Sequence, residues 1–198
     1  MRNPCALLLM CAVACTSQGS EAAERREDTV ARRDSIAAVA AATMSEDQAI
    51  GLLEQTHAAD SALGALAAAR GSTTEVKEFG RMILREHHAL KREALSMAQG
   101  LRLTPRTPRV APDAPPAAML EHLQSGSSGL RWDQAYIEYA IAMHQSAMEN
   151  SARALAASRS PETKRFIERS VPIIQKHLDK AVSLRKTISQ ADTAAPTR

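Results

Sequence analysis

Four histidines and one aspartate lie on apolar stripes of the sequence, each three or four residues from apolar neighbours. His57 and Asp60 share one stripe, and His87, His144 and His177 each lie on a separate one. Such spacing places the side chains on one face of an α-helix, so each stripe carries a titratable group toward a protein interior. Burial without partners costs on the order of several kcal/mol, so these groups must satisfy one another, meet water or bind a cation.

A transition metal is the chemically specific interpretation of this set. The candidate ligands are Asp60, His87, His144 and His177. Three neutral imidazoles and one carboxylate suit iron, zinc, copper or manganese. His57 is a further candidate, and Glu54 with His57 forms the i, i+3 pair found in di-iron bundles. A complete di-iron centre is disfavoured because it needs two such pairs and several buried carboxylates. The alternative is an interhelical hydrogen-bond network that holds no metal.

Four long helices are expected to position these groups. They are predicted at residues 45–70, 72–100, 132–157 and 161–190, with a short helical piece at 117–123 and a flexible tail at 191–198. Ser45 with Gln48 forms a capping box at the start of the first helix, and Ser72 with Glu75 forms a second. Each polar group then lies near the middle of its helix, so the groups approach one another. Two other histidines, at 88 and 122, are expected to face water.

The long connection between the second and third helices determines the predicted topology. Residues 101–116 include five prolines, which exclude a regular helix there. A polyproline segment of twelve residues covers about 37 Å, which is about the length of a 25-residue helix. The crossover at residues 101–131 can therefore run the whole length of a bundle. We predict an all-α, four-helix bundle of ferritin-like type with up-down-down-up order, at residues 45–190.

The N-terminal residues are typical of an exported protein. A positive start precedes an apolar run at residues 6–14, and small residues lead into Cys15. This pattern resembles the lipobox of bacterial lipoproteins, which implies a signal peptide at residues 1–14, acylation of Cys15 and attachment to a membrane through lipid. No aspartate follows Cys15, which implies the periplasmic face of the outer membrane. Polar residues 15–44 are expected to form a tether. The alternative is an ordinary cleaved signal peptide in which Cys15 is incidental.

Composition and cysteine usage exclude several functional classes. The net charge is only +3 with both signs interleaved along the chain, so nucleic-acid binding has no electrostatic basis here. Cys5 and Cys11 lie within the expected signal peptide, and Cys15 is the remaining cysteine. A thiolate catalyst, a zinc-thiolate site and a disulfide are therefore not expected. The sequence has neither a glycine-rich phosphate loop nor a nucleophile elbow, so nothing indicates an enzyme of hydrolysis or phosphate transfer.

Three spaced motifs resemble a family of bacterial envelope proteins. They run from Phe79 to His87, from Gly129 through Trp132, Asp133 and Tyr136 to His144, and from Val171 through Pro172 to His177. Over about residues 46–188 the chain resembles domain of unknown function 4142 (DUF4142). The resemblance implies a ferritin-like fold, an envelope location and a candidate site, with Asp60 where the family tends to carry glutamate. It implies no particular activity. The competing hypothesis is a non-catalytic structural or stress-related envelope interaction protein without metal.

Overall fold

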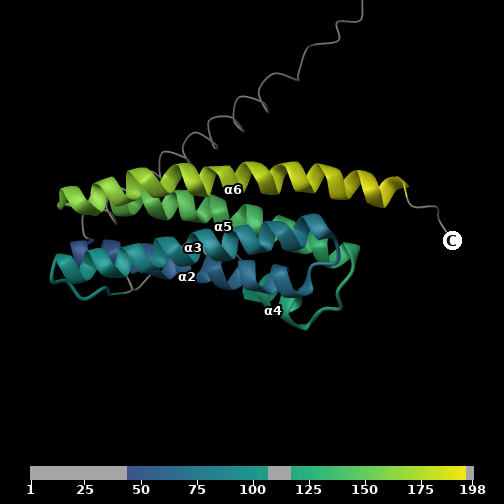
Figure 1. Ribbon diagram of the computed structural model, residues 1–198, viewed down its shortest axis with the longest axis horizontal. Helices are drawn as coiled ribbons and strands as arrows, with labels where there is room; N and C mark the ends of the chain where they lie inside the picture. The colour runs from purple at the N-terminus through teal and green to yellow at the C-terminus, as the bar shows by residue number, and fades with distance from the viewer. Residues whose placement is uncertain (1–43, 107–116, 195–198) are drawn as a thin grey trace, which may run out of the picture. The chain divides into compact units, whose positions relative to one another are not determined.

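All the secondary structure in the described part of the chain is helical. A computed structural model describes residues 44–106 and 117–194 (Figure 1). The helices are α2 (Glu46–Arg70), α3 (Thr74–Gly100), α4 (Ala117–Ser125), α5 (Leu130–Ala157) and α6 (Pro161–Ala194). The predicted signal peptide, Cys15 and residues 15–43 of the tether lie outside the described residues. None of the described helices is long and apolar enough to cross a membrane.

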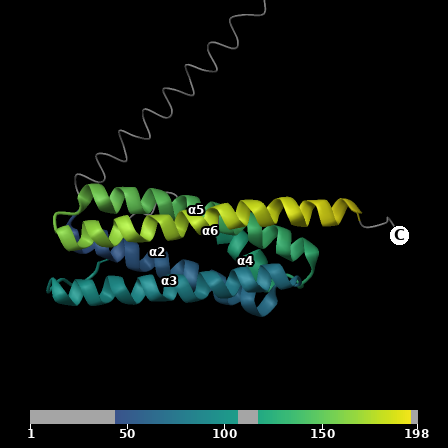
Figure 2. The same ribbon diagram turned by 45° about the horizontal axis from the view of Figure 1, so that its top comes forward.

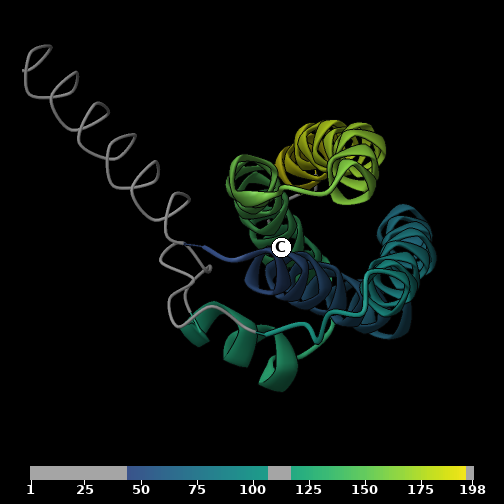
Figure 3. The ribbon, with the colours of Figure 1, turned by 90° about the vertical axis from the view of Figure 1, so that its left-hand side faces the viewer.

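The four long helices form the predicted up-down-down-up bundle. α3 and α5 run in the same direction. α2 is antiparallel to α3, and α6 is antiparallel to α5 (Figures 1 and 2). Arg106 donates its backbone N–H to Asp47 at the start of α2 over 3.0 Å. Arg70, at the other end of α2, donates to the carbonyls of Gln124 and Gly126. The described parts of the crossover therefore lie against opposite ends of α2, and Figure 3 shows α4 outside the four long helices.

The helix starts agree with the predictions at α2 and α6 and differ at α3 and α5. α5 begins at Leu130, two residues before the predicted start at 132. The capping box at Ser45 is confirmed, because Gln48 Oε1 accepts from the Ser45 backbone N–H over 3.0 Å. The predicted cap at Ser72 is wrong by one residue. Thr73 is the N-cap, and its hydroxyl accepts from the Val76 N–H. α6 also continues four residues beyond the predicted end at 190.

Ser72 and Thr73 both hydrogen-bond to a buried carboxylate. Asp133, in the first turn of α5, is 0% exposed. It accepts four hydrogen bonds of 2.8 Å, from the backbone N–H and the hydroxyl of both Ser72 and Thr73. These bonds tie the turn between α2 and α3 to the start of α5. Both carboxylate oxygens of Asp133 thus have hydrogen-bond donors, and Asp133 can be compared with Asp60, the other buried aspartate among the described residues.

The apolar core has two parts with a polar layer between them. The first part includes Leu63, Ile83, Ala140 and Ala181, and the second includes Leu53, Leu90, Ala154 and Phe166. The sequence-predicted polar groups lie between the two parts along each of the four helices. The bundle is therefore interrupted at mid-height by buried titratable side chains.

Two glycines bring α2 and α3 unusually close beside this layer. A β-carbon on Gly64 would lie 2.4 Å from the Leu84 backbone nitrogen, and one on Gly80 would lie 2.8 Å from the Gly64 carbonyl oxygen. Neither position can carry a side chain unless the helices separate. Gly64 lies one turn beyond Asp60, so this close approach holds Asp60 against the middle of α3.

Candidate metal centre

The structure brings the sequence-predicted groups together at mid-bundle. His57 and Asp60 come from α2, His87 from α3, His144 from α5 and His177 from α6. All five are 0% exposed. Each lies near the middle of its helix, so four separate elements contribute donors to one level of the bundle. Such convergence depends on the long crossover, which fixes the direction of α5 relative to α3.

Three of the rings form a chain that leads from the interior to the surface. His57 Nδ1 lies 3.2 Å from His87 Nδ1, and His87 Nε2 lies 3.0 Å from His177 Nδ1. His177 Nε2 lies 2.9 Å from Glu86 Oε2. The Glu86 side chain is 22% exposed and also accepts from Lys176 Nζ over 2.6 Å. The chain of imidazoles therefore ends at a carboxylate that solvent reaches.

The geometry of this chain determines which nitrogen of each neutral ring carries its proton. The ionised Glu86 carboxylate only accepts, so His177 donates through Nε2–H and accepts at Nδ1. His87 must then donate through Nε2–H, which leaves its Nδ1 to accept from His57 Nδ1–H. His57 Nε2 is consequently a bare lone pair.

Several acceptors in the layer have no donor. His144 donates Nδ1–H to the Ala140 carbonyl over 2.7 Å, so its Nε2 is also a bare lone pair. His144 Nε2, His57 Nε2 and both carboxylate oxygens of Asp60 are buried and have no hydrogen-bond partner among the described residues. The Tyr136 hydroxyl likewise has no partner there. A purely internal hydrogen-bond network therefore leaves an excess of acceptors, and an excess of acceptors is what a bound cation relieves.

Burial keeps the rings in the neutral form that binds metals. Burial, reinforced by the neighbouring rings, lowers the pKa of His57 to about 4 and the pKa of His87 well below its usual value. Burial also lowers the pKa of His177 to about 4, although Glu86 acts in the opposite direction. The pKa of Asp60 is raised by burial to about 6. At pH 7 the rings of His57, His87 and His177 are thus neutral, and the Asp60 carboxylate is mainly ionised.

The donors divide into two triplets instead of the single predicted set of four. One triplet is His87, His144 and His177, and the other is His57, Asp60 and His87. Within each triplet the ligand atoms lie within 4.8 Å of one another. His87 belongs to both triplets because its two ring nitrogens face different partners.

One predicted candidate, Glu54, lies outside the polar layer. Its carboxylate pairs with Lys91 at 3.4 Å. His88 and His122 are exposed, as expected. The contact of Glu86 with His177 was not predicted from the sequence, because Glu86 lies off the apolar stripe that carries His87. The adjacent pairs Glu86-His87 and Lys176-His177 were the signal for this contact, because two helices that meet through their histidines bring the preceding charges together.

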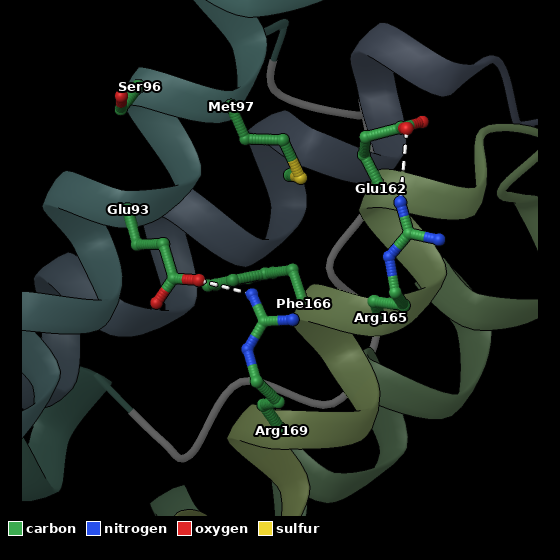
Figure 4. Close-up of a pocket in the computed structure, with 7 residues that line it drawn as sticks. All are labelled: Glu93, Ser96, Met97, Glu162, Arg165, Phe166 and Arg169. Atoms are coloured by element: carbon green, nitrogen blue, oxygen red, sulfur yellow. Dashed lines mark hydrogen bonds and ion pairs between the residues drawn. The ribbon is translucent and has the colours of Figure 1, made fainter.

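A groove lies between α3 and α6, toward the end of the bundle where α6 begins. Figure 4 shows Glu93 paired with Arg169 across the groove, and Arg165 paired with Glu162 at 3.1 Å along α6. Each of these four charged side chains has an opposite charge beside it. In contrast to the buried layer, no charged group drawn there is left without a partner.

Comparison with known proteins gives a family and two similar folds. Residues 31–184 match the family described as "Domain of unknown function (DUF4142)". A DUF305 fragment from Deinococcus radiodurans is similar in structure, with 19% identity and a TM-score of 0.64 over 73% of this chain and 97% of that chain. CopM in its Cu(II)-bound form is similar over the same shares, with 14% identity and a TM-score of 0.59. No curated protein matches the sequence. The TM-scores show that these two proteins share the fold of this chain.

Proposed function

The chain belongs to the DUF4142 family, and we propose that its bundle binds a transition-metal ion, with copper as the favoured metal, through His87, His144 and His177. The observation that carries this proposal is the excess of buried acceptors over donors at mid-bundle. His144 Nε2 has a lone pair with no partner among the described residues and belongs to the same triplet as His87 and His177. A cation supplies what the protein groups cannot supply to one another.

The spacing of the ring nitrogens supports coordination. Two nitrogens bound at about 2.0–2.1 Å to one ion lie about 2.9 Å apart at the right angles of tetragonal copper(II) and about 3.3 Å apart at tetrahedral angles. His87 Nε2 and His177 Nδ1 are 3.0 Å apart, so a small adjustment of the rings admits the ion. Three protein donors leave a fourth position for water or another ligand. Glu86, bonded to the other nitrogen of His177, would orient that ring from outside the site.

Copper is favoured over iron and zinc for two reasons. Imidazole donors suit all three metals, but at a given site of nitrogen and oxygen donors copper(II) binds more tightly than the other divalent ions of the first row. A protein of similar fold has been solved in a Cu(II)-bound form. Iron is further disfavoured because Asp60 is the single carboxylate in the two triplets.

The test is copper affinity in protein purified without a histidine tag. Removal of the unbonded donor in His144→Ala is expected to weaken copper binding at least about tenfold in a titration against a competing chelator. His88→Ala removes an exposed histidine from the helix that carries His87 and is the matched control, with wild-type affinity expected. Equal affinity in all three proteins would overturn the proposal. So would a folded wild type that binds no copper, an outcome that supports a non-catalytic envelope protein whose polar layer fixes helix register.

From the N-terminal residues we propose that the protein is located in the bacterial envelope. Cys15 would carry lipid, and residues 15–44 would hold the bundle away from the periplasmic face of the outer membrane. Support for this proposal comes from the sequence alone, in which small residues lead from an apolar run into Cys15. Lipid attachment would also limit the bundle to a layer close to the membrane.

Replacement of Cys15 by serine tests the anchor. The variant is expected to remain unprocessed and to carry no acyl chain, because the hydroxyl cannot replace the thiol that accepts the lipid. Mass spectrometry of the expressed protein and fractionation of the membranes measure both effects. Normal processing with unchanged membrane fractionation would show that the cysteine is incidental.

A further inference from the structure

We propose that the bundle holds a second metal ion, on the other side of the His87 ring from the first. His87 would then bind one ion through each ring nitrogen, with His57 and Asp60 as the partner ligands on the second side. This inference rests on the proposed function, because the first ion is the one bound by His87, His144 and His177.

Each nitrogen of His87 faces its own set of donors. Nε2 lies 3.0 Å from His177 Nδ1, whereas Nδ1 lies 3.2 Å from His57 Nδ1 and 3.4 Å from Asp60 Oδ2. The last two distances bracket the separation of about 3.3 Å expected for ligand atoms on a tetrahedral ion. The two separations that involve His87 therefore match those of a coordination site, and all three ligand atoms of the second triplet lie within 4.8 Å of one another.

Asp60 is the residue that the first ion leaves unexplained. It belongs to the second triplet, and both of its oxygens are buried without a hydrogen-bond donor among the described residues. The contrast with Asp133 is direct, since that buried carboxylate accepts four hydrogen bonds. An unpaired buried carboxylate is costly, and a cation beside it offsets that cost.

Charge and proton balance are consistent with two ions. Binding through both nitrogens requires the His87 ring to release its single proton to solvent, and the ring then carries one negative charge. The neutral His57 ring keeps its one proton but moves it from Nδ1 to Nε2, which frees Nδ1 to coordinate the second ion. Asp60 contributes a second negative charge, and Glu86, which is bonded to His177, contributes a third. The two hydrogen bonds of His87, to His57 and to His177, are replaced by coordination of the same atoms.

Stoichiometry and magnetism of the copper-loaded full-length protein provide the test. We expect equilibrium dialysis with Cu(II) to give two ions per chain, and with Zn(II) the same number. Two Cu(II) ions that share one ring couple their spins, so the electron paramagnetic resonance intensity should fall well below that expected from the copper content. This second readout uses the wild type and does not depend on the folding of any variant.

Variants of the second side identify where the second ion binds. Asp60→Asn, which preserves shape, and His57→Phe, which fills the space of the ring, are each expected to retain one ion with full signal intensity. His88→Ala should retain two coupled ions. One ion in the wild type, or two ions in both second-side variants, would overturn the second site and leave the first intact. No bound copper in the folded wild type would instead overturn the proposed function itself.

Discussion

At pH 7, Asp60→Asn is expected to stabilise the metal-free protein by about 2 kcal/mol. Burial raises the pKa of Asp60 from 3.8 to about 6, so the ionised carboxylate opposes folding by about 3 kcal/mol at neutral pH. Asparagine has nearly the same shape and carries no charge. Part of the gain is lost because its buried amide still has polar groups to satisfy. Urea unfolding followed by circular dichroism, in the presence of a chelator, measures the difference.

The pH dependence of the stability gained in Asp60→Asn distinguishes an effect of the lost charge from an effect of changed packing. An acid whose pKa is raised in the folded state opposes folding fully above its folded pKa, and the penalty disappears as the pH falls toward the unfolded pKa. The gain should therefore be large at pH 7 and small near pH 4. Asp133→Asn is the matched control and should destabilise the protein by about 1–3 kcal/mol, because the amide offers one uncharged acceptor oxygen to donors that now share two, and its NH2 group faces at least one of them. A loss of stability in Asp60→Asn at pH 7 would contradict the description of Asp60 as unpaired.

Acidification of the metal-free protein from pH 7 to about 4.5 is expected to lower its free energy of unfolding by roughly 5 kcal/mol. His57, His87 and His177 all have a folded pKa below the usual value of 6.5, so unfolding lets each ring take up a proton in this window. A base whose pKa is lowered by folding contributes stability above its unfolded pKa and loses it as the pH falls toward the folded pKa. Asp60 opposes this, leaving a net uptake of about two protons over most of the window, at about 1.4 kcal/mol per proton per pH unit.

Urea midpoints measured at several pH values between 7 and 4.5 check this prediction. His57→Phe should flatten the dependence, because it removes one of the three rings. His88→Ala, which changes an exposed histidine, should leave the curve unchanged. A wild-type midpoint that stays constant between pH 7 and pH 5 would show that the buried rings do not titrate on unfolding.

The topology and the level of the polar layer were predictable from the sequence for physical reasons. Proline restricts its own backbone and that of the preceding residue, so the crossover had to be extended and long enough to reach the far end of α2. The rise per residue of a helix is fixed, so counting residues from the turns placed His87, His144 and His177 at a common height. Both predictions follow from backbone geometry, and the structure confirms the topology.

The grouping of the donors could not be predicted in the same way. Whether Asp60 joins His144 or His57 depends on the rotation of each helix about its axis and on the ring orientation of His87, which spacing does not specify. Glu54 shows that residue spacing alone does not place a side chain in the site. It lies three residues before His57, yet its carboxylate pairs with Lys91 at the edge of the bundle. The cap of α3 is Thr73, in a turn that a carboxylate distant in sequence, Asp133, holds through hydrogen bonds from Ser72 and Thr73. Tertiary contacts decided each of these cases.

Anomalous diffraction at the copper absorption edge, from crystals of the untagged protein loaded with copper, tests the central claim most directly. The account predicts a strong peak inside the bundle, at about 2.0–2.1 Å from ring nitrogens of His87, His144 and His177. Copper found only at the exposed His88 or His122, with no peak at mid-bundle, would contradict it.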